Sequence, residues 1–393
     1  MSDIISKKTK HAALARPDLG EFGRHELAFL GAPCGLIQQL ARELAHRLSP
    51  ALRVAYVDAD HAGHDQETAA QMMAPGFAES AFSAELTDKI SFRQLNLRRG
   101  LDRFSQPELL AHESLVLVNG NHFRARQQVI ILDPRKPLER KLDRLTEVQL
   151  ILLTDSQTEL PNYLRAHLAA TGRPLPPQRR LNDVAGIADW LRGWYAAAVP
   201  PLRGLVLAGG LSQRMQTDKS RLRYPGRPEQ RAHAAALLGA VCQDVHISGR
   251  PEQLADLPAS LTPLPDKLLG LGPVGGLLTA FQTDPNAAWL VLACDLPFLT
   301  ADTLEFLVRH RQPGRAATAF QSPRDEFPEP LITIWEPRSY ATLLRFLSLG
   351  YSCPRKALIN SDIELLQAPR PDELRNINTP AERQAAEREL SGS

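Results

Sequence analysis

Cysteine is scarce in this sequence, and its spacing is not that of a metal or disulfide framework. The 393 residues include four cysteines, and no two of them form a C-x-x-C pair. Widely separated single cysteines argue against a zinc knuckle or a disulfide-stapled scaffold. We therefore expect packing residues in a protein of a reducing compartment, the cytoplasm. These residues are Cys34, Cys242, Cys294 and Cys353.

Long apolar runs and an excess of charge are missing as well. No stretch is long enough to span a bilayer, and Met1 to Lys10 lack the apolar core of a signal peptide. The formal net charge is only +2, which gives no electrostatic reason to expect a nucleic acid or a membrane surface as partner. The sequence thus predicts a soluble cytoplasmic protein that binds neither.

Proline, in contrast, is plentiful and marks a domain boundary. Among the 31 prolines, Pro200 and Pro201 stand together directly after a helix-like segment over 183–195. A chain of this length has room for two or three domains with cores of their own. We expect four segments: a polar arm over 1–23, a first domain over 24–198, a linker over 199–202 and a second domain over 203–393.

The first domain has the pattern of a parallel α/β layer. Apolar residues at helical spacing over 36–48 follow the first of several strand-like runs. Such near-continuous apolar runs are typical of strands covered on both faces. They occupy 26–31, 54–60, 115–123, 128–133 and 148–154.

The loop from Gly31 to Gly35 has the architecture of a P-loop but lacks its chemistry. Leu36, Ile37 and Gln38 stand where a lysine would reach phosphates and a Ser or Thr would hold magnesium. One interpretation is an inactive nucleotide site on a domain kept as a scaffold or docking surface, and we favour it. The other is that Gly31, Gly35 and the helix N-terminus still bind an anion through backbone N–H groups.

Polar side chains gather where strands of this domain end, which is where open α/β sheets place ligands. A metal site formed by Asp58, Asp60, His61 and His64 is one interpretation, and solvated loop residues are the other, which we favour. The residues are Asp58, Asp60, His61, His64, Asn119, Asn121 and His122.

The most informative stretch runs from Arg203 to Leu222. An apolar run of strand character ends at Gly209 and Gly210, and a polar loop with Ser212, Arg214, Asp218 and Lys219 follows. Two glycines allow the backbone N–H groups to approach an anion, while Arg214 and Lys219 supply positive charge. The spacing differs from that of a Walker loop, so we predict a phosphate-binding loop of another kind.

Later segments add candidates at the ends of further strands. The stretch over 288–299 reads as a buried strand with Asp295 at its C-terminal end, where this residue either caps the next helix or presents the hard oxygen that Mg²⁺ prefers. Asp266 is a short acceptor for a base or ribose, and a glycine-rich turn at 272–276 after it opens a helix. Near the chain end, Thr379 and Pro380 have the order of a helix cap, directly after Asn378.

The stretch after Arg203 resembles the signature L-A-G-G-x-S-x-R-M-G-x-D-K of nucleotidyltransferases, most closely the molybdenum cofactor guanylyltransferases of the MobA family. Gln216 departs from it, standing where the family has glycine, and Ser248-Gly249-Arg250 lacks the asparagine usual at that strand exit. The resemblance implies a Rossmann-like nucleotidyltransferase domain. It assigns Arg214 and Lys219 to catalysis, Asp295 to Mg²⁺ and Asn378 to the pterin side. For nucleotide binding it implies Leu207, Ala208, Gly209, Gly210, Ser212, Lys219, Ser248, Asp266 and Asp295.

The first domain resembles the GTP-binding adaptor MobB over most of 24–195, without the Walker lysine. This similarity implies a P-loop-NTPase-like layer and contacts with molybdoenzymes or cofactor-biosynthesis proteins. Taken together, the resemblances imply transfer of GMP from GTP to molybdopterin. The alternatives are a cytidylyltransferase for the same pterin, a sugar-phosphate nucleotidyltransferase and a non-catalytic cofactor-delivery adaptor.

Overall fold

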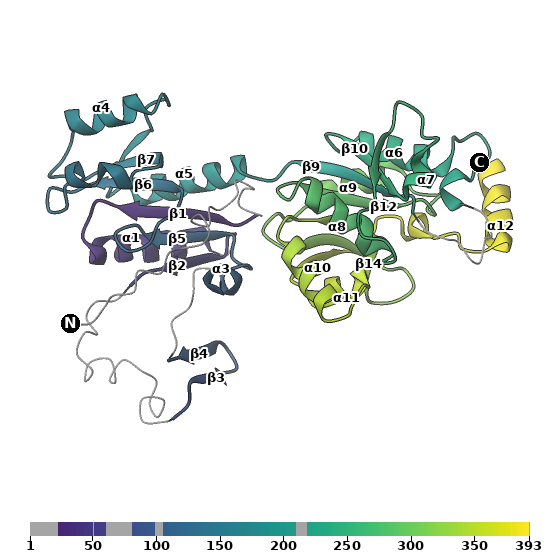
Figure 1. Ribbon diagram of the computed structural model, residues 1–393, viewed down its shortest axis with the longest axis horizontal. Helices are drawn as coiled ribbons and strands as arrows, with labels where there is room; N and C mark the ends of the chain where they lie inside the picture. Colours follow the sequence, from purple (N-terminus) through teal and green to yellow (C-terminus); the bar gives the residue numbers. More distant parts are fainter. Residues whose placement is uncertain (1–22, 50, 60–80, 99–104, 210–217, 393) are drawn as a thin grey trace, which may run out of the picture.

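The structure contains two large sheets, each covered by helices (Figure 1). The computed structural model describes residues 23–49, 51–59, 81–98, 105–209 and 218–392. Within these ranges the strands form a six-stranded sheet, a seven-stranded sheet and a separate hairpin, β3 (Ala84–Asp88) with β4 (Arg93–Leu97). The predicted α/β class with parallel sheets is confirmed. No helix in the described ranges combines the length and apolar character needed to cross a membrane.

The first sheet is parallel throughout and has the order β2-β5-β1-β6-β7-β8. Its inner strands are almost fully buried, as their continuous apolar runs predict. The strands are β1 (His25–Leu30), β2 (Val54–Val57), β5 (Leu115–Asn119), β6 (Gln127–Leu132), β7 (Glu147–Leu153) and β8 (Gln178–Arg180).

Helices cover both faces of this sheet. On one face α1 (Cys34–Leu48) and α5 (Val184–Ala197) pack against β1, β5, β6 and β7 through a shared apolar cluster. On the other face α4 (Asn162–Ala170) and the 3₁₀ turn η2 (Glu139–Arg144) pack against β6 and β7. The short helix α3 (Ser105–Leu109) precedes β5.

The second sheet begins with a doubly wound order. Its strands are arranged β11-β10-β9-β12-β14-β13-β15, so the first four in the chain lie in the order 3-2-1-4. These four are parallel, whereas β14 runs antiparallel to both β12 and β13. The strands are β9 (Leu202–Leu207), β10 (Val245–Gly249), β11 (Thr262–Pro265), β12 (Ala288–Ala293), β13 (Ala317–Gln321), β14 (Pro328–Trp335) and β15 (Ile363–Leu366).

Helices also lie on both faces of the second sheet. One face carries α6 (Gln230–Gly239), α7 (Pro251–Leu254) and α9 (Ala301–Arg309). The other carries α8 (Pro273–Thr283), α10 (Ser339–Ser348) and α11 (Pro354–Ile359). The last helix, α12 (Pro380–Ser391), packs on Tyr224 through Ala386, in a cluster that also includes Ile377. The 3₁₀ turns η3 (Lys219–Arg221) and η4 (Pro371–Leu374) complete this half.

This strand order places a crevice at one edge of the second sheet. After β9 the chain moves outward to β10 and β11, then returns to add β12 on the other side of β9. The loops that leave β9 and β12 therefore separate at the carboxyl edge and leave a crevice there, the usual ligand site of open α/β sheets. Leu207 at the end of β9 is in register with Ala293 of β12 and Ser248 of β10.

Candidate active site

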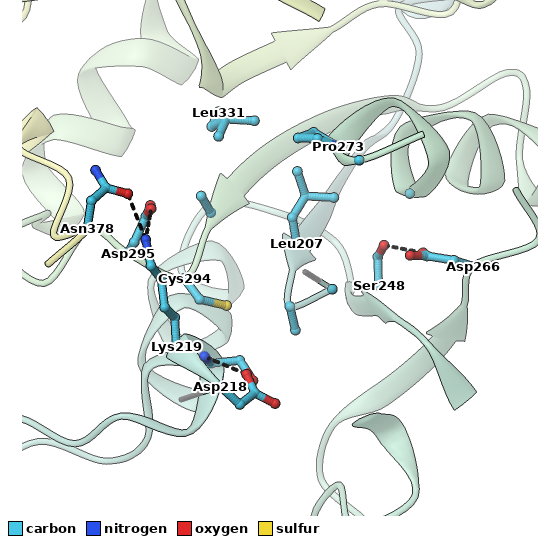
Figure 2. A pocket seen from close by; sticks show the side chains of 16 residues that line it. Leu207, Asp218, Lys219, Ser248, Asp266, Pro273, Cys294, Asp295, Leu331 and Asn378 are labelled. Atoms are coloured by element: carbon cyan, nitrogen blue, oxygen red, sulfur yellow. Dashed lines mark hydrogen bonds and ion pairs between the residues drawn. The ribbon is translucent and has the colours of Figure 1, made fainter. Parts of the chain in front are cut away.

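A cavity of about 440 Å³ lies at this carboxyl edge (Figure 2). Its volume falls within the range of small-molecule sites. The structure brings eight of the sequence-predicted residues to its walls: Leu207, Ala208, Gly209, Lys219, Ser248, Asp266, Asp295 and Asn378. Three others, Gly210, Ser212 and Arg214, lie outside the described residues.

Lys219 is the cationic side chain among the described residues that line the cavity. It is the first residue of η3, and Asp218 caps this turn by accepting hydrogen bonds from Ser220 N at 3.0 Å and Ser220 Oγ at 2.7 Å. The Lys219 ammonium donates to Asn378 Oδ1 at 2.7 Å and to Asp295 Oδ2 at 3.2 Å. Three segments far apart in the sequence therefore meet at a single charged group.

Asp295 follows β12 and faces Lys219 with a side chain that is only 15% exposed. Burial raises the pKa of this carboxyl, and the neighbouring Lys219 opposes that shift. One carboxylate oxygen, Oδ2, is paired with Lys219. The other, Oδ1, is buried and has no hydrogen-bond partner among the described residues. An ionised carboxylate with one open lone-pair face suits a ligand that brings positive charge.

Asn378 is positioned by the start of α12. Thr379 is the N-cap and Pro380 the first helical residue, as the sequence predicts. The Glu382 carboxylate completes a capping box by accepting from Asn378 N at 2.6 Å and Thr379 N at 3.0 Å. Ile377 N also donates to the backbone oxygen of Asp295 at 2.9 Å, which ties the chain end to the β12 loop.

Ser248 and Asp266 form a second polar pair, on the far side of Leu207 from Lys219 in Figure 2. Ser248 Oγ donates to Asp266 Oδ1 at 2.6 Å, and Asp266 N donates to the backbone oxygen of Gly249 at 2.9 Å. Burial raises the pKa of Asp266, while the Ser248 hydrogen bond opposes that shift. The cavity thus has one end with a cation and another with hydrogen-bonding acceptors.

Glycines bring the walls close together. A Cβ atom on Gly276 in α8 would lie 2.3 Å from Ser248 Oγ, and one on Gly209 would lie 3.2 Å from Asp266 Oδ2. Gly272, the N-cap of α8, has φ of 58°, a conformation that favours glycine. The helix N-terminus therefore reaches the cavity edge beside β9 and β10.

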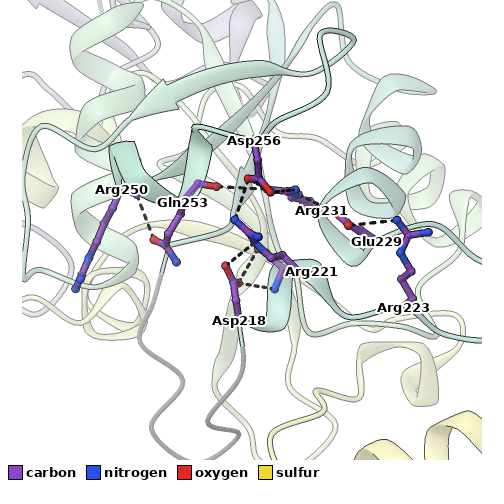
Figure 3. Close-up of polar contacts among 9 residues, drawn as sticks. Asp218, Arg221, Arg223, Glu229, Arg231, Arg250, Gln253 and Asp256 are labelled. Carbon is purple, nitrogen blue, oxygen red and sulfur yellow. Dashed lines mark hydrogen bonds and ion pairs between the residues drawn. The ribbon is translucent and has the colours of Figure 1, made fainter.

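An ion-pair network around Asp256 holds η3 against the neighbouring helices (Figure 3). Arg221 pairs with Asp256 at 2.9 Å, and the buried Arg231 of α6 pairs with the same carboxylate at 3.2 Å. The hydrogen bond from Arg231 is the main cause that holds the pKa of Asp256 below its usual range. This network fixes the turn that carries Lys219.

Comparison with known proteins agrees with this geometry. The family model described as "MobA-like NTP transferase domain" matches residues 204–362. A probable molybdenum cofactor guanylyltransferase from Rhodopirellula baltica is 31% identical over 195 residues, which cover 47% of this chain and 92% of that protein. The chain belongs to the MobA-like NTP transferase family. The prediction of a nucleotidyltransferase is therefore confirmed.

Two further known proteins are similar to slightly less than half of this chain. A molybdenum cofactor biosynthesis bifunctional protein from Synechocystis is 34% identical over 181 residues, or 46% of this chain. The match spans 52% of that protein, so about half of its length is covered. The crystal structure of molybdopterin-guanine dinucleotide biosynthesis protein A from Archaeoglobus fulgidus has a TM-score of 0.42 and 21% identity, covering 49% of this chain and 100% of that one.

Some residues of the MobA-like site were not identified from the sequence. Pro273 and Gly276 line the cavity because α8 approaches β9 and β10, and Leu331 of β14 lines it from a strand whose position depends on the sheet order. Glu382 could have been found, since Thr379-x-x-Glu382 has the spacing of a capping box. Nothing in the local sequence indicates that this box would fix Asn378 beside Lys219.

The metal chemistry open to the MobA-like site is limited. Among the described residues, no three His, Cys, Asp or Glu side chains are grouped so that they could hold a metal ion. Among the described residues that line the cavity, Asp295 is the carboxylate with a buried oxygen that has no partner. That arrangement suits Mg²⁺ better than zinc, because Mg²⁺ takes one or two carboxylates together with water and substrate phosphates.

Proposed function

We propose that this chain transfers GMP from GTP to molybdopterin, giving the guanine dinucleotide form of the cofactor and pyrophosphate. The relatives from Rhodopirellula baltica and Pseudomonas putida are named molybdenum cofactor guanylyltransferases, and this chain covers 92% and 96% of their lengths. The observation that carries the proposal is the meeting of Lys219 and Asp295 in one cavity beside β9. A scarcity of cysteine and the biosynthetic relatives support a cytoplasmic location.

The end of the cavity near Lys219 is assigned to the phosphates. A phosphate oxygen of molybdopterin attacks the α-phosphorus of GTP, the bond from that phosphorus to the bridging oxygen breaks, and pyrophosphate leaves. Lys219 stabilises the charge that builds up on the phosphoryl oxygens. Its contacts with Asp295 and Asn378 hold the ammonium ready before substrate binds. The sequence adds Gly210 and Ser212 as phosphate ligands and Arg214 as a second cation.

Asp295 is assigned to Mg²⁺. Its unpartnered Oδ1 fits the ion, and Lys219 on Oδ2 helps keep the carboxylate ionised despite its burial. When bound, Mg²⁺ supplies positive charge to the phosphates and helps align them. Asp295 itself contributes by holding one hard oxygen at the carboxyl end of β12, a position fixed by six residue pairs in register between β12 and β9.

The end of the cavity near Ser248 and Asp266 is assigned to the base and ribose. Guanine presents N–H donors, and the hydroxyls of ribose are donors too, so a carboxylate acceptor is complementary to both. Ser248 orients Asp266 through a hydrogen bond of 2.6 Å. Leu207, Ala208 and Gly209 provide the floor between the two ends, and Asn378 is assigned to the pterin side.

For the first half we propose a P-loop-like, MobB-like domain over 24–198, joined through residues 199–202 to the transferase domain over 203–393. In support, α5 ends at Ala197 and β9 begins at Leu202, with Pro200 and Pro201 between the two large sheets. The parallel sheet with α1 directly after β1 also supports it. Because the Walker lysine is missing, we assign this domain to docking of acceptor proteins.

The direct test is pyrophosphate release from the purified full chain with Mg²⁺, molybdopterin and each nucleoside triphosphate in turn. We expect turnover with GTP. Turnover with CTP alone would replace the proposal by cytidylyl transfer to the same pterin. Turnover with a sugar 1-phosphate and not with molybdopterin would indicate a sugar nucleotidyltransferase. The lack of turnover with any acceptor would indicate a non-catalytic cofactor-delivery adaptor.

Charge-removing variants test the assignment of the site. Lys219→Ala and Asp295→Asn should each lower kcat by about 10²–10³-fold, since each removes a preorganised charged group. Lys356→Ala and Asp302→Asn are matched controls outside the cavity and should keep wild-type turnover. Near-normal kcat in Asp295→Asn at saturating Mg²⁺ would refute the metal assignment.

A further inference from the structure

A thiol and an imidazole meet at the carboxyl edge of the first sheet, in the half of the chain that nucleotidyl transfer does not use. Cys34 Sγ lies 3.1 Å from His122 Nε2. Cys34 is the first residue of α1, directly beyond β1, and His122 follows β5, the strand that pairs with β1. The pair therefore results from the sheet order, which joins residues 88 positions apart.

A carboxylate stands beside the imidazole. Asp58 Oδ1 lies 3.9 Å from His122 Nε2. Asp58 is itself fixed, because Oδ1 accepts from Asn119 Nδ2 at 2.8 Å and Oδ2 accepts from the Tyr56 hydroxyl at 2.6 Å. A positioned carboxylate stabilises the imidazolium that forms when a histidine takes up a proton.

A side-chain amide and a helix N-terminus lie beside the sulfur. Asn121 Nδ2 is 3.6 Å from Cys34 Sγ and is anchored to the backbone oxygen of Ala32 at 2.9 Å. The helix α1 has 15 residues, no side chain caps its N-terminus, and its first turn contains no acidic residue. The N-terminal dipole of α1 and the Asn121 amide thus both point positive charge at the sulfur. Cys34 is half-buried.

We propose that Cys34 is a reactive thiol that forms a mixed disulfide with small disulfides of the glutathione class. His122 Nε2 accepts the Cys34 proton as Sγ attacks one sulfur of the disulfide. The disulfide bond breaks, one half stays on Cys34, and the other leaves as a thiolate that takes the proton from His122. Cys34 is thereby oxidised and the leaving half reduced, with no other reactant needed.

The remaining cysteines provide internal comparisons. Burial raises the pKa of Cys242 to about 12 and also raises the pKa of Cys294, so both thiols stay protonated near neutral pH. Cys353, the N-cap of α11, is exposed. If exposure alone set the rate of modification, Cys353 would react fastest of the four cysteines. A faster reaction at Cys34 therefore requires that its thiol is activated.

The test incubates the reduced full chain with oxidised glutathione at neutral pH and follows each cysteine by peptide mass spectrometry. We expect Cys34 to be modified faster than Cys353 in the same sample. We also expect His122→Gln to lower the rate of Cys34 modification by about 10²-fold, the loss typical of removing a general base. His112→Gln, a matched change at an exposed histidine, should leave the rate unchanged.

Modification of Cys34 no faster than Cys353 would overturn the proposal, and the wild-type chain alone decides this outcome. An unchanged Cys34 rate in a folded His122→Gln chain would overturn the role of the imidazole. The Cys294 rate measured in the variant distinguishes a specific effect from unfolding, since unfolding would accelerate the reaction of this buried thiol. Cys34 and His122 lie outside the cavity assigned to guanylyl transfer, so the test is independent of the proposed function.

Discussion

Asp295 shows how a single residue can be placed for function at a cost to the fold. Burial raises the pKa of its carboxyl, so holding the ionised form inside the protein is unfavourable. Lys219 donates a hydrogen bond to only one carboxylate oxygen, Oδ2. The other oxygen, Oδ1, has no partner among the described residues. A packing role would favour an apolar side chain here, so this arrangement is best explained by a ligand that brings positive charge.

Asn378 is the neutral partner of Lys219 and provides a test at the residue scale. Asn378→Ala removes the 2.7 Å acceptor of the ammonium, while Asp295 still holds it. Loss of one such hydrogen bond is worth about 1 kcal/mol, so kcat/KM for GTP should fall roughly tenfold or less. Steady-state kinetics measure this change.

Asn360→Ala is the control for this prediction. Asn360 is an exposed asparagine that hydrogen-bonds Lys356 O within the last turn of α11, away from the cavity. Its removal should leave kcat/KM unchanged. A loss in Asn378→Ala as large as that in Lys219→Ala would mean that Asn378 takes part in the transfer itself.

At the scale of elements, the close packing of α8 on β9 and β10 shapes the cavity. The first turn of α8 contains two glycines because neighbouring atoms occupy the space of a side chain. A Cβ on Gly275 would lie 2.2 Å from the backbone oxygen of Leu268, and one on Gly276 would lie 2.8 Å from Leu207 Cδ2. The sequence indicates a glycine-rich turn, and the packing gives its reason.

Gly276→Ala should push α8 away from the sheet. The added Cβ would lie 2.3 Å from Ser248 Oγ, so the hydrogen bond from Ser248 to Asp266 must shift. We expect a loss of about 1–3 kcal/mol in the free energy of unfolding, as for overpacked sites. We also expect a higher KM for GTP. Urea unfolding and kinetics measure the two effects.

Gly239→Ala is the matched control in α6. No atom lies within 4 Å of the added Cβ, so the substitution has space. An alanine in a helix is more favourable than glycine, and stability should be unchanged or rise by up to about 1 kcal/mol. Equal effects of the two substitutions would contradict the close-packing explanation.

At the scale of the whole molecule, the two halves meet through polar contacts. Arg338, at the start of α10, donates to the backbone oxygens of Gly23, Ala111 and Glu113 in the first half. Arg53 of the first half pairs with Asp362 and donates to Gly314 O at 2.6 Å in the second. His25 lies beside this junction, with its ring against Trp194 and Tyr195.

The junction should make stability depend on pH. Burial, aided by the charge of Arg338, lowers the pKa of His25 from 6.5 to about 4. The unfolded chain therefore takes up the proton first as the pH falls. The stability due to neutral His25 is complete above pH 6.5 and is lost toward pH 4, a change of roughly 3 kcal/mol.

The experiment compares urea unfolding of the wild-type chain and His25→Phe between pH 7 and pH 4. Phenylalanine keeps a ring against Trp194 and Tyr195 but has no group to protonate. As the pH falls, the wild-type chain should therefore lose more unfolding free energy than the variant. A constant difference over this range would contradict the prediction.

The sequence predicted elements best where burial on both faces left a continuous apolar run. The strands β1, β5, β6, β7, β9 and β12 and the helices α1, α5 and α6 follow such patterns closely. It gave no indication of β11 and β15, because short strands with exposed positions lack a clear period. The antiparallel insertion of β14 between β12 and β13 depends on pairing between distant residues, which local patterns do not encode.

The sequence by itself determined the chemistry of this protein: the glycine pair after β9, the family-specific loop with Lys219, and a single aspartate after β12. The tertiary structure decided which groups act together. It brought Lys219, Asp295 and Asn378 within hydrogen-bond distance, and it paired Cys34, which the sequence places among the packing residues, with His122. The physical reason is that parallel strands bring their carboxyl ends to one edge, and only strand order decides which ends are neighbours.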